Sequence, residues 1–234
     1  MRGFVLPGRK LFILMLSAFL ISCSRLPVIG PAASSAVDIQ RCGRPFPDIP
    51  YRFVHAIEAA LPGGRAGMVL GVTVVDPASK SIRSAIMTIE GFVLFDAQYE
   101  KKLYVHRALP PFEGKDFAEY IMEDIRLVFL PPEGRLSDAG LLEDGSTICR
   151  YEEKHGKIMD VIVHRDDTWE IGTYRNRYKQ LRKVSAFPLR DGIPAILELT
   201  AFESGHYSLR LNLISAEPAS FEETQLRPEE IPGQ

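Results

Sequence analysis

Short apolar runs with a period of two residues fill most of the chain and predict a protein built mainly of β-strands. Ten runs are rich in β-branched and aromatic residues and are separated by turn-forming residues. They are Met68–Val75, Ser81–Thr88, Gly91–Tyr99, Lys102–Leu109, Ser146–Glu153, Lys157–His164, Trp169–Lys179, Leu181–Leu189, Ala195–Glu203 and His206–Ser215. Because most connections between neighbouring runs are short, we expect an antiparallel meander.

Two longer segments have helical spacing of their apolar residues instead. Asp48–Leu61 ends at Pro62-Gly63-Gly64, which predicts a helix before the first strand. A second helix is predicted between Asp116, its expected cap, and Pro131-Pro132. Its apolar stripe consists of Phe117, Ala118, Ile121, Met122, Ile125, Val128 and Phe129. Ser137–Glu143 is interpreted as a further short helical turn.

The last predicted strand shows how the sheet is covered. Apolar and polar residues alternate along it, so that one face carries Tyr207, Leu209, Leu211 and Leu213. An antiparallel sheet with one apolar face needs a cover, and the Phe117–Phe129 helix is the expected one. Residues 48–215 are enough for one well-buried domain and too few for two ordinary ones.

The first 22 residues have the composition of a secretory signal peptide. Basic residues precede an apolar run from Leu11 to Phe19, which is shorter than the roughly 20 residues that span a bilayer. The following Leu20-Ile21-Ser22-Cys23 resembles the bacterial lipobox. This resemblance implies that residues 1–22 are removed and that Cys23 carries the lipid. An ordinary signal peptide with an incidental Cys23 is the alternative.

A lipid on Cys23 predicts both an address and a geometry. Two or more acyl chains anchor a protein stably to a membrane. Ser24 in the second mature position, rather than aspartate, implies the outer membrane of a Gram-negative cell, facing the periplasm. Residues 23–47 are rich in small residues and proline and are interpreted as a flexible tether. Residues 216–234 contain five glutamates and three prolines and are interpreted as a disordered acidic tail.

Charge and cysteine content agree with an exported protein that binds no nucleic acid. The chain has 28 basic and 30 acidic residues, and the signal peptide contains only basic ones. No basic excess is present to attract nucleic acid. With Cys23 modified, Cys42 and Cys149 form an even pair in an oxidising compartment. A disulfide between them is the favoured interpretation, and two separate buried thiols are the alternative.

No recognised catalytic motif is present. The sequence lacks G-x-S-x-G, H-E-x-x-H, C-x-x-C and the P-loop pattern. The segments 152–155 and 164–167 combine histidine with carboxylates, but both are interpreted as solvated hairpin tips rather than metal sites. Asp124 is placed on the polar side of the second helix, where a lone carboxylate is usually hydrated. We therefore expect a monomeric protein without enzymatic activity, metal or cofactor.

One cluster of cations stands out. Arg175, Arg177 and Lys179 alternate in the predicted strand Trp169–Lys179, which places them on one face. They are candidate contacts for phosphate headgroups or for an acidic partner protein. A solvated outer strand face is the alternative.

Three stretches of the domain, together with the lipobox, resemble the periplasmic LolA/LolB-like lipoprotein carriers and their uncharacterised outer-membrane relatives. They are GFVLFDAQYEKKLYVHRALPPF (91–112), DFAEYIMEDIRLVFLPPEGRL (116–136) and AILELTAFESGHYSLRLNLIS (195–215). The resemblance covers residues 48–215. It implies a mainly β (α+β) fold, in which an open antiparallel half-barrel of about ten strands has helices over its concave face.

The resemblance also implies a function. Members of the family bind acyl chains between sheet and helices, so the candidate cavity-lining residues are Phe117, Ile121, Met122, Ile125, Phe129, Tyr207, Leu209 and Leu211. The membrane-anchored receptor of the family projects an apolar residue from the loop after its third strand. The corresponding connection is predicted here as Gln98-Tyr99-Glu100-Lys101, where only Tyr99 is a possible substitute. A dedicated carrier for one lipid-linked product is therefore as compatible with the sequence as a general receptor.

These expectations lead to two hypotheses. The first is an outer-membrane lipoprotein that holds an acyl chain or lipid-bearing cargo and assists its transfer or insertion. It would take a periplasmic carrier or an envelope complex as its partner. The second is a scaffold lipoprotein of an envelope complex with no lipid in its core.

Overall fold

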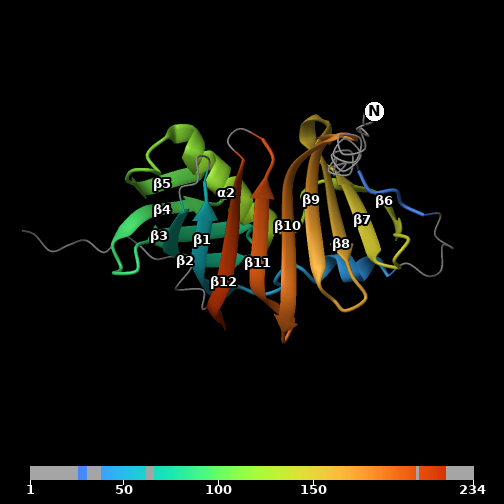
Figure 1. The fold of residues 1–234 in the computed structure, drawn as a ribbon, viewed down its shortest axis with the longest axis horizontal. Coiled ribbons are helices and arrows are strands. Elements are labelled where there is room, and N and C mark those ends of the chain that lie inside the picture. Colours follow the sequence, from blue (N-terminus) through green and yellow to red (C-terminus); the bar gives the residue numbers. More distant parts are fainter. Residues whose placement is uncertain (1–25, 31–37, 62–65, 204–205, 220–234) are drawn as a thin grey trace, which may run out of the picture.

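The computed structural model describes residues 26–30, 38–61, 66–203 and 206–219. The predicted signal peptide, Cys23 and residues 220–234 lie outside this part of the chain. Within it, twelve strands form one antiparallel sheet in the order β5-β4-β3-β2-β1-β12-β11-β10-β9-β8-β7-β6. Strands β5 and β6 are the two edges and do not pair with each other, so the sheet is open rather than a closed barrel (Figure 1).

The mainly β architecture predicted from the sequence is confirmed, and each of the ten predicted runs contains a strand. The strands are β1 (Tyr51–Ala60), β2 (Ala66–Asp76), β3 (Ser81–Met87), β4 (Val93–Tyr99), β5 (Leu103–Ala108), β6 (Arg135–Leu141), β7 (Thr147–Glu152), β8 (Ile158–Val163), β9 (Trp169–Asn176), β10 (Lys179–Arg190), β11 (Ile193–Ala201) and β12 (Tyr207–Pro218). The count of about ten was too low because two segments predicted as helices are strands.

The first of these segments is β1, where the sequence predicted a helix before the first strand. It pairs with β2 on one side and with β12 on the other. Its apolar residues also satisfy a period of two, and the buried Phe53 and His55 point to the same face. Spacing alone therefore allowed either structure. The presence of β12, more than 140 residues later, decides for the strand.

The second segment is β6, which covers most of the predicted helical turn Ser137–Glu143. It pairs only with β7, at the edge of the sheet. Its residues are mostly exposed, so the sequence carried little hydrophobic signal for a strand there. An edge strand such as β6 forms because the neighbouring strand supplies its hydrogen bonds, even where its own residues are exposed.

The predicted second helix is confirmed as α2 (Lys115–Phe129), which covers one face of the sheet, called the concave face here (Figure 1). Its N-cap is Gly114, so Asp116 lies in the first turn and does not cap the helix. Met122, Val128 and Phe129 are buried in the core that helix and sheet share. Among the described residues α2 is the only α-helix, so one helix covers the sheet where several were expected.

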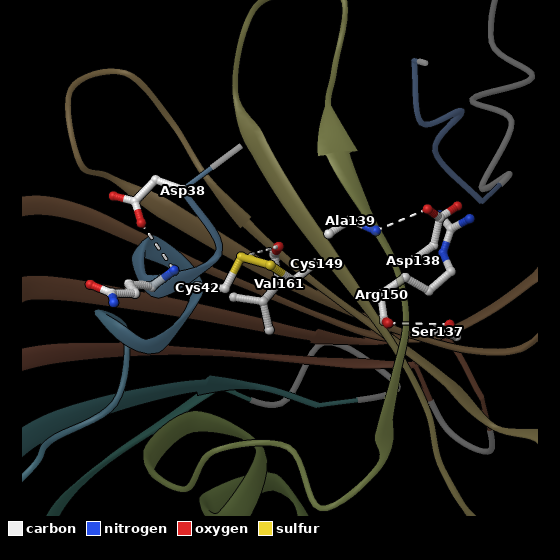
Figure 2. Close-up of a disulfide and its surroundings, with 9 residues drawn as sticks. Asp38, Cys42, Ser137, Asp138, Ala139, Cys149, Arg150 and Val161 are labelled. Atoms are coloured by element: carbon white, nitrogen blue, oxygen red, sulfur yellow. Dashed lines mark hydrogen bonds between the residues drawn. A yellow bond between two sulfur atoms is a disulfide. The ribbon is translucent and has the colours of Figure 1, made fainter. Parts of the chain in front are cut away.

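The chain before β1 is anchored to the sheet over part of the predicted tether. A 3₁₀ helix, η2 (Ile39–Gly43), places Cys42 against β7, where it forms a disulfide with Cys149 (Figure 2). The two sulfur atoms lie 2.07 Å apart and both cysteines are buried. Phe46 is buried in the same core. Residues 38–47 therefore belong structurally to the domain.

Candidate ligand-binding site

An apolar strip runs along the concave face where α2 covers the sheet only partly. Val69, Leu209, Leu211 and Leu213 come from the sheet, and Ile121 and Ile125 come from the helix. All six side chains are half-buried and pack against the buried core. Polar residues of β12 such as Arg210 point to the opposite face, where Arg210 pairs with Glu198 of β11. The alternation predicted for the last strand is thus confirmed.

A cavity of about 190 Å³ opens at one end of the concave face. It lies between residues 44–48, the start of β1, the end of α2 and the turn between β10 and β11. Aromatic rings form much of its wall: those of Tyr51, Phe53, His55, Phe129 and Trp169. Phe53 and Phe129 stack with their ring centroids 4.9 Å apart. Since a cavity of about 150 Å³ can hold benzene, this space admits a group of about six carbons.

Besides the exposed Arg44, Asp48 and Asp191, two buried polar groups stand in the wall of this aromatic cavity. Trp169 is 3% exposed, and its indole nitrogen has no hydrogen-bond partner among the described residues. The His55 side chain is buried beside the stacked rings of Phe53 and Phe129, and burial lowers the pKa of its imidazole to about 4. His55 is therefore neutral at physiological pH. An indole N–H without a partner costs free energy, and an acceptor atom on a ligand would satisfy it.

A buried ion pair joins α2 to the sheet. The Arg182 guanidinium of β10 donates to Asp124 at 2.8 Å, and the Tyr207 hydroxyl of β12 donates to the other carboxylate oxygen. Arg182 also donates to Glu203 at 3.0 Å. Asp124 is 6% exposed, so the prediction of a hydrated carboxylate was wrong. No local pattern indicated this contact, because Asp124, Arg182 and Tyr207 lie far apart along the chain.

Burial sets the electrostatics of this cluster. It raises the pKa of the Asp124 carboxyl, an effect that the Tyr207 hydrogen bond and the Arg182 charge oppose. Burial also raises the pKa of the Tyr207 phenol, which the neighbouring Asp124 charge raises further. For Arg182, burial acts to lower the pKa, but Asp124 outweighs it and raises the pKa instead. Tyr207 and Arg182 thus remain donors to Asp124.

The eight predicted cavity-lining residues lie in different parts of this site. Phe129 borders the aromatic cavity, whereas Met122 is part of the closed core. Four are in or beside the apolar strip: Ile121, Ile125, Leu209 and Leu211. Tyr207 is held in the ion-pair cluster, and Phe117 lies half-exposed at the start of α2, against Phe112. Trp169 and His55 were not predicted to line a cavity, because the cavity forms only where residues 44–48 pack near them.

The predicted strand face of three cations does not exist. The chain turns at Arg177 and Tyr178, so Arg175 lies one residue before the end of β9 and Lys179 begins β10. The three cations are nonetheless exposed together around one hairpin turn. Arg175 pairs with Glu203 at 3.3 Å. The one local signal for this turn is Asn176, whose side chain accepts from the Tyr178 N–H at 3.0 Å. The sequence analysis instead continued the strand to Lys179.

The loop after the third strand is also different from the predicted one. Because β1 is a strand, the third strand is β3, and the loop after it is residues 88–92 rather than Gln98–Lys101. A tight turn, in which Gly91 donates to the Thr88 carbonyl, holds this loop. Ile89 is 61% exposed and Phe92 is 57% exposed. The chain therefore presents two apolar residues at this loop.

A larger hollow of about 670 Å³ lies at the ends of β1, β2, β11 and β12. The register of these strands places Glu58, Glu198 and Arg210 on its surface, on the face opposite the apolar strip. The half-exposed Met68 borders it.

In the described ranges no group of acidic, histidine and cysteine side chains is arranged to hold a metal ion. Nor does any helix there combine the length and hydrophobicity needed to cross a membrane.

Comparison with known proteins identifies the fold. No known family matches the chain by sequence, and no curated protein is similar enough to be matched. Among solved structures, a LolA superfamily protein from Nitrosomonas europaea is similar with a TM-score of 0.52 and 10% sequence identity. The similarity covers 82% of this chain and 95% of that one. The chain therefore shares the fold of this LolA superfamily protein, as its sequence resemblance predicted.

Two further solved structures are similar at a lower level. One is a domain assigned to outer-membrane lipoprotein sorting from Vibrio parahaemolyticus, with a TM-score of 0.45, 7% identity and coverage of 80% and 93% of the two chains. The other is a DUF1329 family protein from Desulfovibrio piger, with a TM-score of 0.48, 12% identity and coverage of 78% and 90%.

Proposed function

We propose that this chain is a non-enzymatic lipoprotein of the outer membrane that holds an acyl chain, or cargo bearing one, against its concave face. In this role it assists transfer or insertion of that cargo at the membrane. The proposal includes the lipid on Cys23. The observation that carries it is the half-buried apolar strip between α2 and the sheet, which continues the core yet remains accessible.

Burial of an acyl chain against this strip releases enough free energy to offset the cost of binding. Each methylene removed from water contributes roughly 0.8 kcal/mol, so a chain of ten methylenes offsets ordinary binding costs. The aromatic cavity admits only the first few carbons. A longer chain has to continue along the apolar strip, which α2 covers only partly. The Trp169 indole N–H, which is buried without a partner beside this cavity, would donate to a carbonyl or carboxyl oxygen at one end of the chain.

The loop 88–92 supports a role in delivery. Ile89 and Phe92 are exposed at the end of a hairpin, where apolar side chains gain free energy only by entering a membrane or another protein. The membrane-anchored receptor of the family that this chain resembles uses an apolar residue of the equivalent loop. A receptor-like function is thus better supported by the structure than by the sequence.

A second candidate function is a scaffold in an envelope complex. The hollow over Glu58, Glu198 and Arg210 on the opposite face favours it, because it is accessible and carries charges of both signs. This arrangement suits a protein partner better than an acyl chain.

Native mass spectrometry of the protein purified from cells in mild detergent distinguishes the two functions. A carrier is expected to retain a lipid beyond its own anchor, and Leu211→Gln is expected to lose it. Ile214→Gln is the matched control, since Ile214 lies on the same strand but is 59% exposed at the bulge opposite Val54 and His55. A protein free of additional lipid, or equal occupancy in both variants, would contradict binding at the apolar strip.

A further inference from the structure

The described chain nearest the predicted anchor is fixed to one hairpin of the sheet. The backbone N–H of Leu26 donates to the Arg177 carbonyl at 3.1 Å, in the turn between β9 and β10. The backbone carbonyl of the following residue, Pro27, accepts a hydrogen bond from the Arg150 guanidinium at 2.8 Å. Arg150 is in turn held by two bonds to the fully buried Asp160, at 2.7 and 2.8 Å.

Further contacts continue along this segment. Gly30 forms a β-bridge with Leu141 of β6, and its N–H donates to the Leu141 carbonyl at 3.1 Å. A Cβ atom at Gly140 would lie 2.4 Å from Ile29, so only glycine leaves room for this side chain. Residues 26–30 thus run from the β9–β10 turn to β6 and are part of the folded domain.

The small number of residues between Cys23 and Leu26 limits how far the lipid attachment point can lie from the sheet. Cys23 precedes Leu26 by three residues, which span at most about 11 Å even when fully extended. A lipid on Cys23 therefore lies within about 11 Å of Leu26, close to the β9–β10 turn. The long flexible tether expected from the sequence cannot hold the domain far from the membrane, because the chain is fixed to the sheet almost immediately after its lipid.

The side chains around this turn suit an anionic lipid surface. Tyr178 is 74% exposed at the tip, and Arg177 and Lys179 on either side form no ion pair with any residue that the structure describes. Val28, in the anchored segment, is 84% exposed. Tyrosine rings favour the membrane–water interface, and each Lys or Arg near an anionic surface strengthens binding.

The end of the sheet that carries the β9–β10 turn is also more basic than the opposite end. Ile158 pairs with both Glu152 and Tyr174, so the turn 153–157 lies at the same end as the β9–β10 turn. It adds Lys154 and Lys157 against Glu153. Turns at the opposite end of these strands carry five acids, Glu143, Asp144, Asp166, Asp167 and Asp191, against Arg165, and Asp167 is paired with Arg41 and Arg44.

From these observations we propose that the β9–β10 hairpin, through Arg177, Tyr178 and Lys179, is a docking surface for anionic phospholipid beside the lipid anchor. This inference rests on the lipidation of Cys23 in the proposed function. It orients the domain with the loop 88–92 at the membrane end, since β3 and β4 turn at the same end of the sheet. The aromatic cavity, beside the β10–β11 turn, then opens away from the membrane.

Depth-dependent fluorescence quenching tests the proposal. With Cys42 and Cys149 joined and Cys23 modified, a cysteine introduced by Tyr178→Cys is the only free thiol. It is labelled with a small environment-sensitive fluorophore, and the lipidated protein is reconstituted into vesicles containing phosphatidylglycerol and a headgroup-labelled quencher lipid. Asp166→Cys, at the opposite end, is the matched control. We expect quenching and a blue shift at position 178 and neither at position 166.

The charges are tested in the same vesicles. Adding Arg177→Glu and Lys179→Glu, or replacing phosphatidylglycerol by phosphatidylcholine, is expected to reduce quenching at position 178, while the lipid anchor keeps it above the level of position 166. Equal quenching at both positions in lipidated protein, or quenching at 178 that is unaffected by charge reversal, would overturn the docking surface alone. A purified chain whose mass shows no lipid on Cys23 would instead overturn the proposed anchor, and this inference with it.

Discussion

Asp124 illustrates how a single residue connects helix to sheet in this protein. Its carboxylate is buried on the apolar side of α2 and is satisfied by Arg182 and Tyr207 from two different strands. Such a pair contributes little net stability over an apolar contact but is costly to break, because the remaining charge is left buried. The ion pair therefore fixes where α2 lies over the apolar strip.

Removing the cation tests this contact. We expect Arg182→Met to lower the free energy of unfolding by about 3–5 kcal/mol, because it leaves Asp124 buried and unpaired. Urea denaturation measures the loss. Arg175→Met is the matched control, since Arg175 bonds the same Glu203 but is exposed, and it should cost less than about 1 kcal/mol. Similar losses in both variants would show that the buried pair has no special role.

His55 makes stability dependent on pH. Its pKa is about 4 in the folded protein and about 6.5 in the unfolded chain, so only the unfolded chain takes up a proton as pH falls from 6.5 to 4. The contribution is complete above pH 6.5, and we expect about 3 kcal/mol of stability to be lost by pH 4. Denaturation at several pH values should show a shallower dependence in His55→Phe. An unchanged slope would mean that other groups cause it.

At the scale of elements, β1 shows the limit of periodicity. Its apolar positions fit both a helix and a strand, and the choice depends on hydrogen bonds from β2 and β12. By contrast, α2 has a long apolar stripe that only a helix places on one face, and it was predicted nearly to the residue. Pattern is thus decisive for a long amphipathic element and ambiguous for a short apolar one.

The disulfide fixes another element, the segment that closes the aromatic cavity. Cys42 and Cys149 are 107 residues apart in sequence, and a loop of this length loses considerable entropy on closure. We expect the double variant Cys42→Ala/Cys149→Ala to lose about 2–4 kcal/mol of stability. Guanidinium unfolding measures it, with reductant lowering the stability of the natural protein but not of the variant. Equal stability of the two oxidised proteins would exclude a stabilising disulfide.

At the scale of the whole molecule, pairing of the first strand with the last holds the two halves of the sheet together. β1 and β12 are neighbours at the centre of the strand order, so every strand on one side is joined to the other side through this pair. Long-range pairing of this kind closes a large loop of chain before it contributes any contact.

Truncation tests this view. A chain that ends after His206 lacks β12 and exposes the edges of both β1 and β11, so we expect it to lose cooperative unfolding and near-ultraviolet circular dichroism. A chain that ends after Ala219 keeps β12 and lacks only part of the predicted acidic tail. Its stability should stay within about 0.5 kcal/mol of the full chain. A folded protein without β12 would show that the halves are independent.

The amino-acid pattern was enough to predict the β-rich class, ten of the strands, the covering helix and the resemblance to the LolA superfamily, and it favoured a disulfide between Cys42 and Cys149 over two separate thiols. These follow from local periodicity, residue type and compartment. Tertiary structure alone decided that β1 and β6 are strands, that Asp124 meets Arg182, that residues 44–48 close an aromatic cavity and that residues 26–30 cross the sheet. Each of these depends on partners distant in sequence, whose hydrogen bonds and burial no local pattern contains.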